Sequence, residues 1–269
     1  MIDLGRLRAL HAVASYGTVL AAGDALRCTP SAVSQQLAKL ERETGTTLVE
    51  KDGRGLRLTV AAFATACRAL LPFTLHRLAI DHPKLETGLV EVNPHEGVDA
   101  LRRGHVDLAV LDDWPEVPLR YPPGVAHAEI GRDFADLLVP SGHRLAGGRA
   151  VRLARAKDER WISAKAGDIC HEWLLRVLPG VRPDFHVGEF ETQLTLIAAG
   201  LGIAVIPRLA RPPLPDGVCV VPLRPEPHRR VVVAWREASA ARPAIAAAVR
   251  TLRDAWSRQA AAGQNRAGA

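Results

Sequence analysis

Hydrophobic residues recur at helical spacing along the N-terminal part of the chain. They predict helices over 4–15, 19–26 and 30–41, with Gly17 ending the first and Thr18 able to cap the second. The apolar positions of the first helix are Leu4, Leu7, Leu10, Val13 and Ala14, and those of the third are Val33, Leu37 and Leu40. The short turn 27–29 between the second and third helices is typical of a helix-turn-helix.

The third helix begins with residues suited to a DNA groove. Thr29 is a good N-cap, and Pro30 occupies the first helical position, where its missing N–H costs nothing. Opposite the apolar stripe lie Ser31, Ser34 and Gln35, whose short side chains can reach base edges and phosphates. An ordinary amphipathic surface helix shares these features, so the flanking segments decide between the two interpretations.

A β-wing is predicted after the third helix. Residues 48–50 and 56–58 form two short strand candidates around Asp52-Gly53-Arg54-Gly55, which permits a tight hairpin, and Arg57 lies beside it. Residues 1–59 are therefore interpreted as a winged helix-turn-helix. The predicted DNA-binding residues are Thr18, Thr29, Pro30, Ser31, Ser34, Gln35, Lys39, Lys51 and Arg54.

The remainder of the chain alternates between helical and strand patterns, which predicts an α/β domain. Helices are expected over 70–79, 97–103, 192–199 and 244–256, and strands over 88–92, 107–111, 203–206 and 231–235. The phrases LRRGHVDLAVL and IAAGLGIAVIP repeat one helix–glycine–strand pattern and indicate two lobes of similar construction, with a cleft between them. Residues 257–269 lack an apolar pattern and are predicted to be disordered.

Composition narrows the class of protein only slightly. The net charge of +6 favours an anionic partner, but the charge is not concentrated in residues 1–59, which carry +2 of it (eight Lys/Arg and six Asp/Glu). The four cysteines are scattered without C-x-x-C or zinc spacing, which favours a reducing cytoplasm and predicts neither a metal nor a cofactor. Neither a membrane-length apolar run nor a signal-peptide core is present in the sequence.

The run TPSAVSQQLAKLERETGTTLVEKDGRGLRLT resembles the DNA-binding domain of LysR-type transcriptional regulators. The resemblance extends over most of 60–256 and implies a periplasmic-binding-protein-like effector domain. Lobe I would comprise about 60–140 and 230–256, and lobe II about 141–229, with 138–140 and 232–233 in the crossing strands. It further implies a cytoplasmic bacterial regulator that binds promoter DNA as a dimer or tetramer and responds to a small-molecule effector.

The chain departs from the family pattern at two places. Gly23 and Asp24 stand in the second helix where the family usually has small helix formers, and an interior glycine costs about 1 kcal/mol relative to alanine. The family's long linker helix also has no room here, because 60–63 looks like the first effector-domain strand; alternatively, 60–71 is a shortened linker helix. Self-association is therefore expected to be weakened. A small-molecule-binding protein with impaired DNA binding is the alternative function.

Candidate effector contacts lie in loops at strand ends and at helix starts. They are Thr65, Trp114, Cys170, His171, Glu191 and Thr192. Each has a structural alternative: Trp114 as a core residue, the two threonines as plain helix caps, and His171 as a surface residue. Cys170, His171 and Glu172 are the residue types of a nucleophile, a base and an orienting acid. Adjacent residues of a helix do not face one another, so they cannot form a catalytic relay and an enzyme is not predicted.

Overall fold

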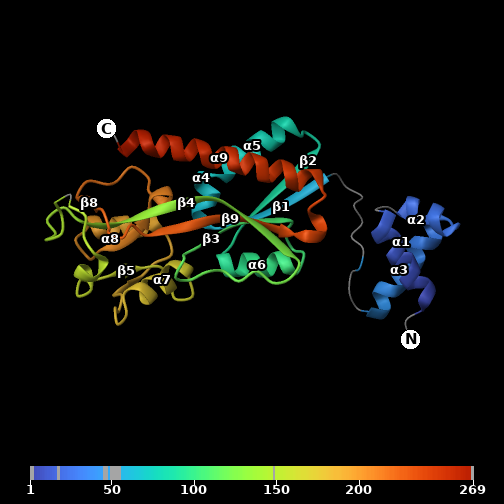
Figure 1. Ribbon diagram of the computed structural model, residues 1–269, viewed down its shortest axis with the longest axis horizontal. Helices are drawn as coiled ribbons and strands as arrows, with labels where there is room; N and C mark the ends of the chain where they lie inside the picture. The colour runs from blue at the N-terminus through green and yellow to red at the C-terminus, as the bar shows by residue number, and fades with distance from the viewer. Residues whose placement is uncertain (1–2, 17–18, 45–47, 49–55, 148, 268–269) are drawn as a thin grey trace. The chain divides into compact units, whose positions relative to one another are not determined.

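The computed structural model describes residues 3–16, 19–44, 48, 56–147 and 149–267. The chain divides into two compact units, Met1–Gly55 and Leu56–Ala269 (Figure 1). The predicted domain boundary after residue 59 therefore moves to residue 55. Each unit has its own hydrophobic core.

The first unit is a three-helix helix-turn-helix. Its helices are α1 (Leu4–Tyr16), α2 (Val19–Leu26) and α3 (Pro30–Thr44), as the apolar spacing predicts. Arg27 adopts a left-handed backbone conformation, with φ of 53°, in the tight turn between α2 and α3. The core of this unit comprises Ala9, Ala12, Val13, Ala22, Val33 and Leu37.

The buried face of α1 differs from the predicted one. Ala9, Ala12 and Val13 are buried, whereas Leu4 and Leu7 are 73% and 43% exposed. Small side chains form most of this contact face, which lets the helices approach closely, and the larger leucines lie on the outer side. The helix was predicted correctly, but of the five apolar positions only Val13 is buried and Leu10 half-buried.

Gly23 has a packing role that the sequence did not reveal. A Cβ atom there would lie 2.9 Å from the carbonyl oxygen of Cys28 and 3.3 Å from the nitrogen of Pro30. The backbone N–H of Cys28 also donates to the carbonyl of Gly23 at 2.9 Å. The glycine therefore permits the turn to close against α2, a role that the helix-propensity argument did not include.

The strand predicted as the second half of the wing belongs to the second unit. Residues 56–58 begin β1 (Leu56–Ala62) and pair in parallel with 85–87 of β2 (Leu85–Glu91), in the sheet of the second unit. Most of 48–55 lies outside the described residues. Because α4 (Ala64–Ala69) follows β1 after a single residue, 60–71 is strand and short helix rather than a linker helix.

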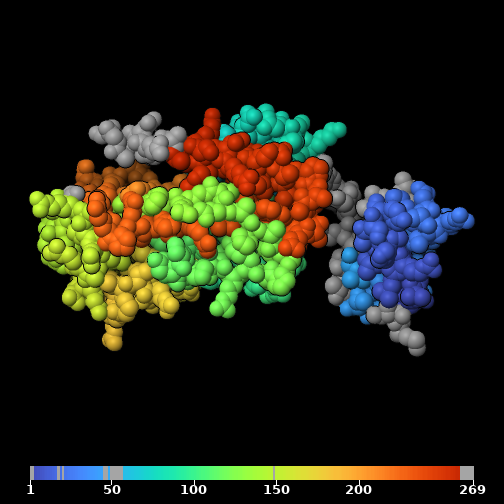
Figure 2. All heavy atoms as spheres, viewed as in Figure 1, coloured from blue at the N-terminus to red at the C-terminus, as the bar shows by residue number. Residues whose placement is uncertain are grey.

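A seven-stranded sheet organises the second unit, in the order β2-β1-β3-β9-β4-β7, with β8 also paired to β4. Strands β1, β2 and β3 (Leu108–Asp113) are parallel, and β9 (His228–Arg236) runs antiparallel to β3 and β4 (Val125–Pro140). Alternate residues of β1 enter different cores: Val60 and Ala62 pack in the core that contains α9 (Pro243–Ala267), whereas Ala61 packs in the core that contains α6 (Pro94–Arg102). Figure 2 shows α5 (Leu71–Asp81) and α9 side by side on the surface.

Strands β4 and β9 connect the two halves of this unit, as the family resemblance implied. We call 56–140 with 228–267 lobe I and 141–227 lobe II. Strand β4 pairs with β9 as far as Phe134, then pairs with β7 (Ala204–Pro207) from Ala135 and with β8 (Val218–Val221) from Leu137. Lobe II adds β5 (Ile162–Ser163), β6 (Phe185–His186), α7 (Ile169–Val177) and α8 (Phe190–Ala198).

The last helix, α9 (Pro243–Ala267), continues well beyond the predicted end at residue 256. Gln259 donates from Nε2 to the carbonyl of Ala69 at 2.8 Å, and the guanidinium of Arg258 lies 4.5 Å from the ring centroid of Phe73. The prediction of a disordered tail is therefore wrong through residue 267. Alanine, glutamine and arginine are good helix formers even without an apolar stripe.

Candidate DNA-binding surface and effector cleft

The start of α3 has the predicted cap. The hydroxyl oxygen of Thr29 accepts a hydrogen bond from the backbone N–H of Ala32 at 3.2 Å, and Pro30 is the first helical residue. Both side chains are exposed. This cap satisfies one of the free N–H groups at the helix start and leaves the others available to an anionic group.

The two faces of α3 have different chemistry. Val33, Leu37 and Leu40 are buried against the unit. Exposed polar residues at helical spacing form the opposite face, which we call the α3 polar face: Ser31, Ser34, Gln35 and Arg42. Lys39 is exposed as well, whereas Thr18, Lys51 and Arg54 lie outside the described residues. Sequence reasoning missed Arg42, although it follows Gln35 by two helical turns and is basic.

Polar contacts of its C-terminal half hold α3 in place. Arg6 of α1 forms an ion pair with Glu43, and hydrogen bonding to Arg6 lowers the pKa of that carboxyl group. Glu41 accepts a hydrogen bond from the backbone N–H of Leu48 at 2.9 Å. These contacts lie near the C-terminal end of the helix, away from Thr29 and the polar residues of the first turns.

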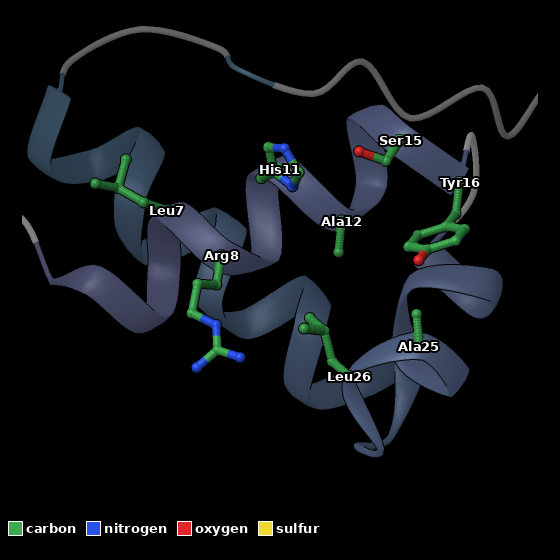
Figure 3. A pocket seen from close by; sticks show the side chains of 8 residues that line it. All are labelled: Leu7, Arg8, His11, Ala12, Ser15, Tyr16, Ala25 and Leu26. Carbon is green, nitrogen blue, oxygen red and sulfur yellow. The ribbon is translucent and has the colours of Figure 1, made fainter.

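A groove of about 420 Å³ lies on the other helices of the first unit (Figure 3). All of its lining residues belong to α1 and α2: Leu7, Arg8, His11, Ala12, Ser15, Tyr16, Ala25 and Leu26. It is larger than the cavity in the second unit, but it contains none of the predicted effector residues. We therefore assign the candidate effector site to the second unit.

The second unit contains a small cavity of about 20 Å³ where lobe I meets lobe II. Its lining comprises Trp114, Ile162, Ser163, Ala164, Cys170, Trp173, Leu174, Phe190, Gln193 and Val205. Two of the six predicted effector residues, Trp114 and Cys170, are among them. A cavity of this size has room for about one water molecule, so a larger ligand requires the lobes to move apart.

Trp114 contributes the lobe I wall of this cavity. It is 1% exposed and stacks on Trp173 of α7, with ring centroids 4.2 Å apart and an interplanar angle of 23°. The indole N–H of Trp173 donates to Glu116 at 3.1 Å, whereas the indole nitrogen of Trp114 is buried without a hydrogen-bond partner. The sequence analysis did not identify Trp173 as a cleft residue, because a tryptophan within an amphipathic helix is usually a core residue.

The neighbouring residues Cys170 and His171 point to different partners. Burial raises the pKa of the Cys170 thiol well above its usual value, so it is protonated. His171 lies 3.0 Å from the hydroxyl of Ser163 through Nδ1 and is nearly buried, and burial lowers its pKa. The histidine is thus a structural residue behind the cavity wall, rather than the surface residue considered above.

The remaining predicted effector residues lie outside the cavity lining. Thr65 is buried in the first turn of α4, and Thr192 is exposed on α8. Glu191 instead links the lobes, because Arg68 of α4 lies 3.3 Å from its carboxylate and 3.2 Å from that of Glu189. Sequence reasoning missed Phe190 and Gln193. Their helical spacing places both on the buried face of α8, whereas Glu191 and Thr192 are exposed.

Buried charges lie where β3, β4 and β9 come together. Arg229 is 1% exposed and lies 3.1 Å from Asp112 and 2.9 Å from Asp133, with its guanidinium 4.9 Å from the ring centroid of Phe63. Burial raises the pKa of Asp112 to about 6. Asp133 also accepts a hydrogen bond from the backbone N–H of Leu209 at 2.9 Å. These groups join the crossing strands beside the cleft.

Neither a metal centre nor a membrane-spanning helix is found among the described residues. No group of three or more His, Cys, Asp or Glu side chains in that part of the chain is arranged to hold a metal ion. None of its helices is long and apolar enough to cross a membrane.

A capped helix with an exposed polar face, joined to an α/β domain with an interlobe cavity, defines a helix-turn-helix regulator with a ligand-binding domain. Residues 4–62 match the family described as bacterial regulatory helix-turn-helix protein, lysR family, and residues 51–257 match the LysR substrate binding domain. The chain therefore belongs to the LysR family of transcriptional regulators. The two matches overlap, so the chain has no separate segment between them for the long linker helix.

Relatives of known name span nearly the whole chain. The probable HTH-type transcriptional regulator LrrA of Synechococcus elongatus is 27% identical over 293 aligned positions, covering 94% of this chain and 97% of the relative. The DNA-binding transcriptional dual regulator OxyR of Escherichia coli is 26% identical over 285 positions, covering 88% and 90%. Each alignment is longer than the chain's 269 residues, so the relatives carry residues that this chain lacks.

Solved structures show the same fold. A cysteine-to-serine variant of OxyR from Corynebacterium glutamicum with hydrogen peroxide bound is 20% identical, with a TM-score of 0.67, and covers 99% of this chain and 96% of that one. At this identity the likeness establishes the fold alone.

Proposed function

We propose that the regulator reads its DNA site by placing the α3 polar face in the major groove. Ser34 and Gln35 would contact base edges, while the capped start of the helix and Arg42 would contact phosphates. The observation that carries this proposal is the separation of the two faces of α3, with three apolar residues buried and the polar ones exposed. We expect the protein to act in the cytoplasm, because its target is DNA.

The test compares variants of neighbouring glutamines. Gln35→Ala should lower discrimination between a specific duplex and random DNA by about 1–3 kcal/mol if the side chain reads a base. Gln36→Ala is the matched control, since Gln36 is also exposed but lies off the spacing of the polar face. A duplex selected by the protein from a random-sequence pool serves as the probe in a mobility-shift titration. Equal losses for the two variants, or no loss for either, would refute the assignment.

The alternative of a ligand-binding protein with impaired DNA binding finds no support. All three helices of the DNA-binding unit are present, α3 is capped by Thr29, and its polar face is exposed. The polar face of α3 does not depend on the short connection between α3 and β1.

We further propose that a small molecule between the lobes controls DNA binding. The cavity behind Trp114 supports this assignment, and Arg68 with Glu189 and Glu191 would restrain the lobes in their closed arrangement. A ligand can shift the arrangement only by its difference in affinity for the open and closed forms. Truncating Trp114 to Ala should therefore weaken effector binding, with little effect on DNA affinity in the absence of effector. A large fall in melting temperature with unchanged ligand affinity would make Trp114 purely structural.

Thiol oxidation is a second candidate signal, since some relatives are named as hydrogen peroxide-inducible genes activators. The reactive form of cysteine is the thiolate. Burial raises the pKa of Cys170 well above its usual value and that of Cys67 to about 11, so both are protonated thiols in this arrangement. These pKa shifts argue against a reactive thiolate at Cys67 and at Cys170.

Self-association is proposed to be a homodimer weaker than the family pattern. The long linker helix that would pair two copies is not among the described residues, and β1 begins at Leu56, soon after α3 ends at Thr44. Dimers would then form through the effector domains. Sedimentation velocity over a concentration series tests this, and a tight tetramer at low concentration would contradict it.

A further inference from the structure

The indole N–H of Trp114 is the polar group at the cleft that lacks a strong acceptor. It is buried with no oxygen or nitrogen partner, and the nearby thiol of Cys170 is only a weak acceptor. Trp114 also lines a cavity with room for about one water molecule. Buried donors in proteins almost always have an acceptor. The other polar side chains of the lining are occupied: Ser163 is hydrogen-bonded to His171, and Gln193 donates to the carbonyl of Val187 at 3.2 Å. The cavity therefore offers one donor that lacks a strong acceptor.

The lining carries no formal charge. Its walls are apolar apart from Ser163, Gln193 and the protonated thiol of Cys170. Beside the lining, the Asp168 carboxylate accepts a hydrogen bond from the backbone N–H of Cys170 at 2.8 Å, whereas the Asp112 carboxylate is paired with Arg229. The local potential is therefore unfavourable for an anion. A neutral ligand with a hydrogen-bond acceptor fits this environment better than a carboxylate or a phosphate.

The two indole rings that meet at the cavity come from different lobes. Trp114 follows β3 of lobe I, Trp173 lies on α7 of lobe II, and their near-parallel rings are in van der Waals contact. If the lobes separate, the two ring faces become the opposite walls of a slot. A flat ring in that slot would stack on both indoles and recover the aromatic contact that the separation removes.

We propose that the effector is a neutral, planar aromatic molecule that inserts between Trp114 and Trp173 and accepts a hydrogen bond from the Trp114 indole N–H. This rests on the proposed function of the cleft as the effector site. In the present arrangement the two indoles close the slot by stacking on each other. Binding then replaces that stacking with ligand contacts on both rings and gives the Trp114 N–H a stronger acceptor.

Three small probes separate the elements of the proposal in the full-length protein. Acetophenone is neutral, aromatic and carries an acceptor; benzoate is its anionic counterpart, and cyclohexyl methyl ketone keeps the carbonyl without the aromatic ring. Each is titrated while the indole N–H signals are followed by ¹H–¹⁵N NMR, with the Trp114 signal assigned from Trp114→Phe. Acetophenone should bind at least tenfold more tightly than the other two probes and shift the signals of both Trp114 and Trp173.

Two variants test the donor. Trp114→Phe keeps an aromatic wall but removes the N–H, and should weaken acetophenone binding several-fold. Trp235→Phe is the matched control, because Trp235 is half-buried in β9 outside the cavity lining, and it should leave binding unchanged. Equal or tighter binding of benzoate or of the cyclohexyl ketone, no binding of acetophenone up to its solubility, or equal losses in both variants would overturn the proposal. An anionic ligand that still bound beside Trp114 would overturn only this ligand class and leave the effector cleft in place.

Discussion

Replacing Arg229 with methionine should strongly destabilise the effector domain. The guanidinium lies within 3.1 Å of the Asp112 carboxylate and 2.9 Å of the Asp133 carboxylate, and all three side chains are buried. Methionine has a similar length but no charge, so Arg229→Met leaves two carboxylates in the interior without a counter-ion. The cost arises from those remaining charges rather than from lost packing.

The expected magnitude follows from the burial of the pair. Removing one partner of a buried ion pair typically costs about 3–5 kcal/mol, whereas replacing the whole group by neutral residues is often close to neutral. For a domain of this size each kcal/mol shifts the melting temperature by about 2–4 °C, so a fall of about 6–20 °C is expected. The matched control combines Arg229→Met with Asp112→Asn and Asp133→Asn, which removes the stranded charges and should restore most of the stability.

Intrinsic tryptophan fluorescence is a suitable assay, because all five tryptophans lie in the effector domain: Trp114, Trp161, Trp173, Trp235 and Trp256. Urea denaturation followed by this signal therefore reports on that domain without a contribution from the DNA-binding unit. The measurement belongs near pH 7.5, above the pKa of about 6 for Asp112. A loss below about 1 kcal/mol for Arg229→Met, or an equal loss in the triple variant, would show that the buried charges are not what stabilises this junction.

Further substitutions test other parts of the chain. Gly23→Ala should destabilise the DNA-binding unit, because the new Cβ would lie 2.9 Å from the Cys28 carbonyl oxygen. Helix propensity alone would instead stabilise it by about 1 kcal/mol. Thermal unfolding followed by circular dichroism decides between them, and a raised melting temperature would contradict the packing role. Thr29→Ala should cost that unit about 1 kcal/mol through loss of the cap, while unchanged stability would mean that the bond to Ala32 contributes nothing. For Asp112 the folded-state pKa of about 6 lies above the ordinary value, so its stabilising contribution is present below about pH 4 and is lost as the pH rises through 6. The difference in unfolding free energy between Asp112→Asn and the parent should therefore grow by about 3 kcal/mol between about pH 3.5 and 7; a flat difference would place the pKa of Asp112 near its ordinary value.

Local patterns in the sequence identified most of the secondary structure. The helix over 19–26 has the predicted limits, and the cap at Thr29 is the predicted one. The predicted strands at 107–111 and 231–235 overlap β3 and β9. These features depend on neighbours within one or two turns, so apolar spacing, prolines and capping residues suffice to indicate them. The family resemblance then supplied the order of the two domains.

The features that failed are those in which a segment has a choice of distant partners. Residues 56–58 form a strand under either interpretation, but only the pairing with 85–87 decides that the strand belongs to the effector domain. The orientation of α1 was likewise set by close approach of Ala9 and Ala12 to the other helices rather than by its larger leucines.

The candidate effector site shows the same division between local and long-range information. The sequence by itself determined that Trp114 and Cys170 lie at element ends, since both positions follow from local strand and helix patterns. Only the tertiary structure decided that Trp114 stacks on Trp173 and that Arg229 pairs with an aspartate 117 positions away. The physical reason is that stacking and charge pairing depend on which surfaces come together after folding. Residue spacing along the chain does not contain that information.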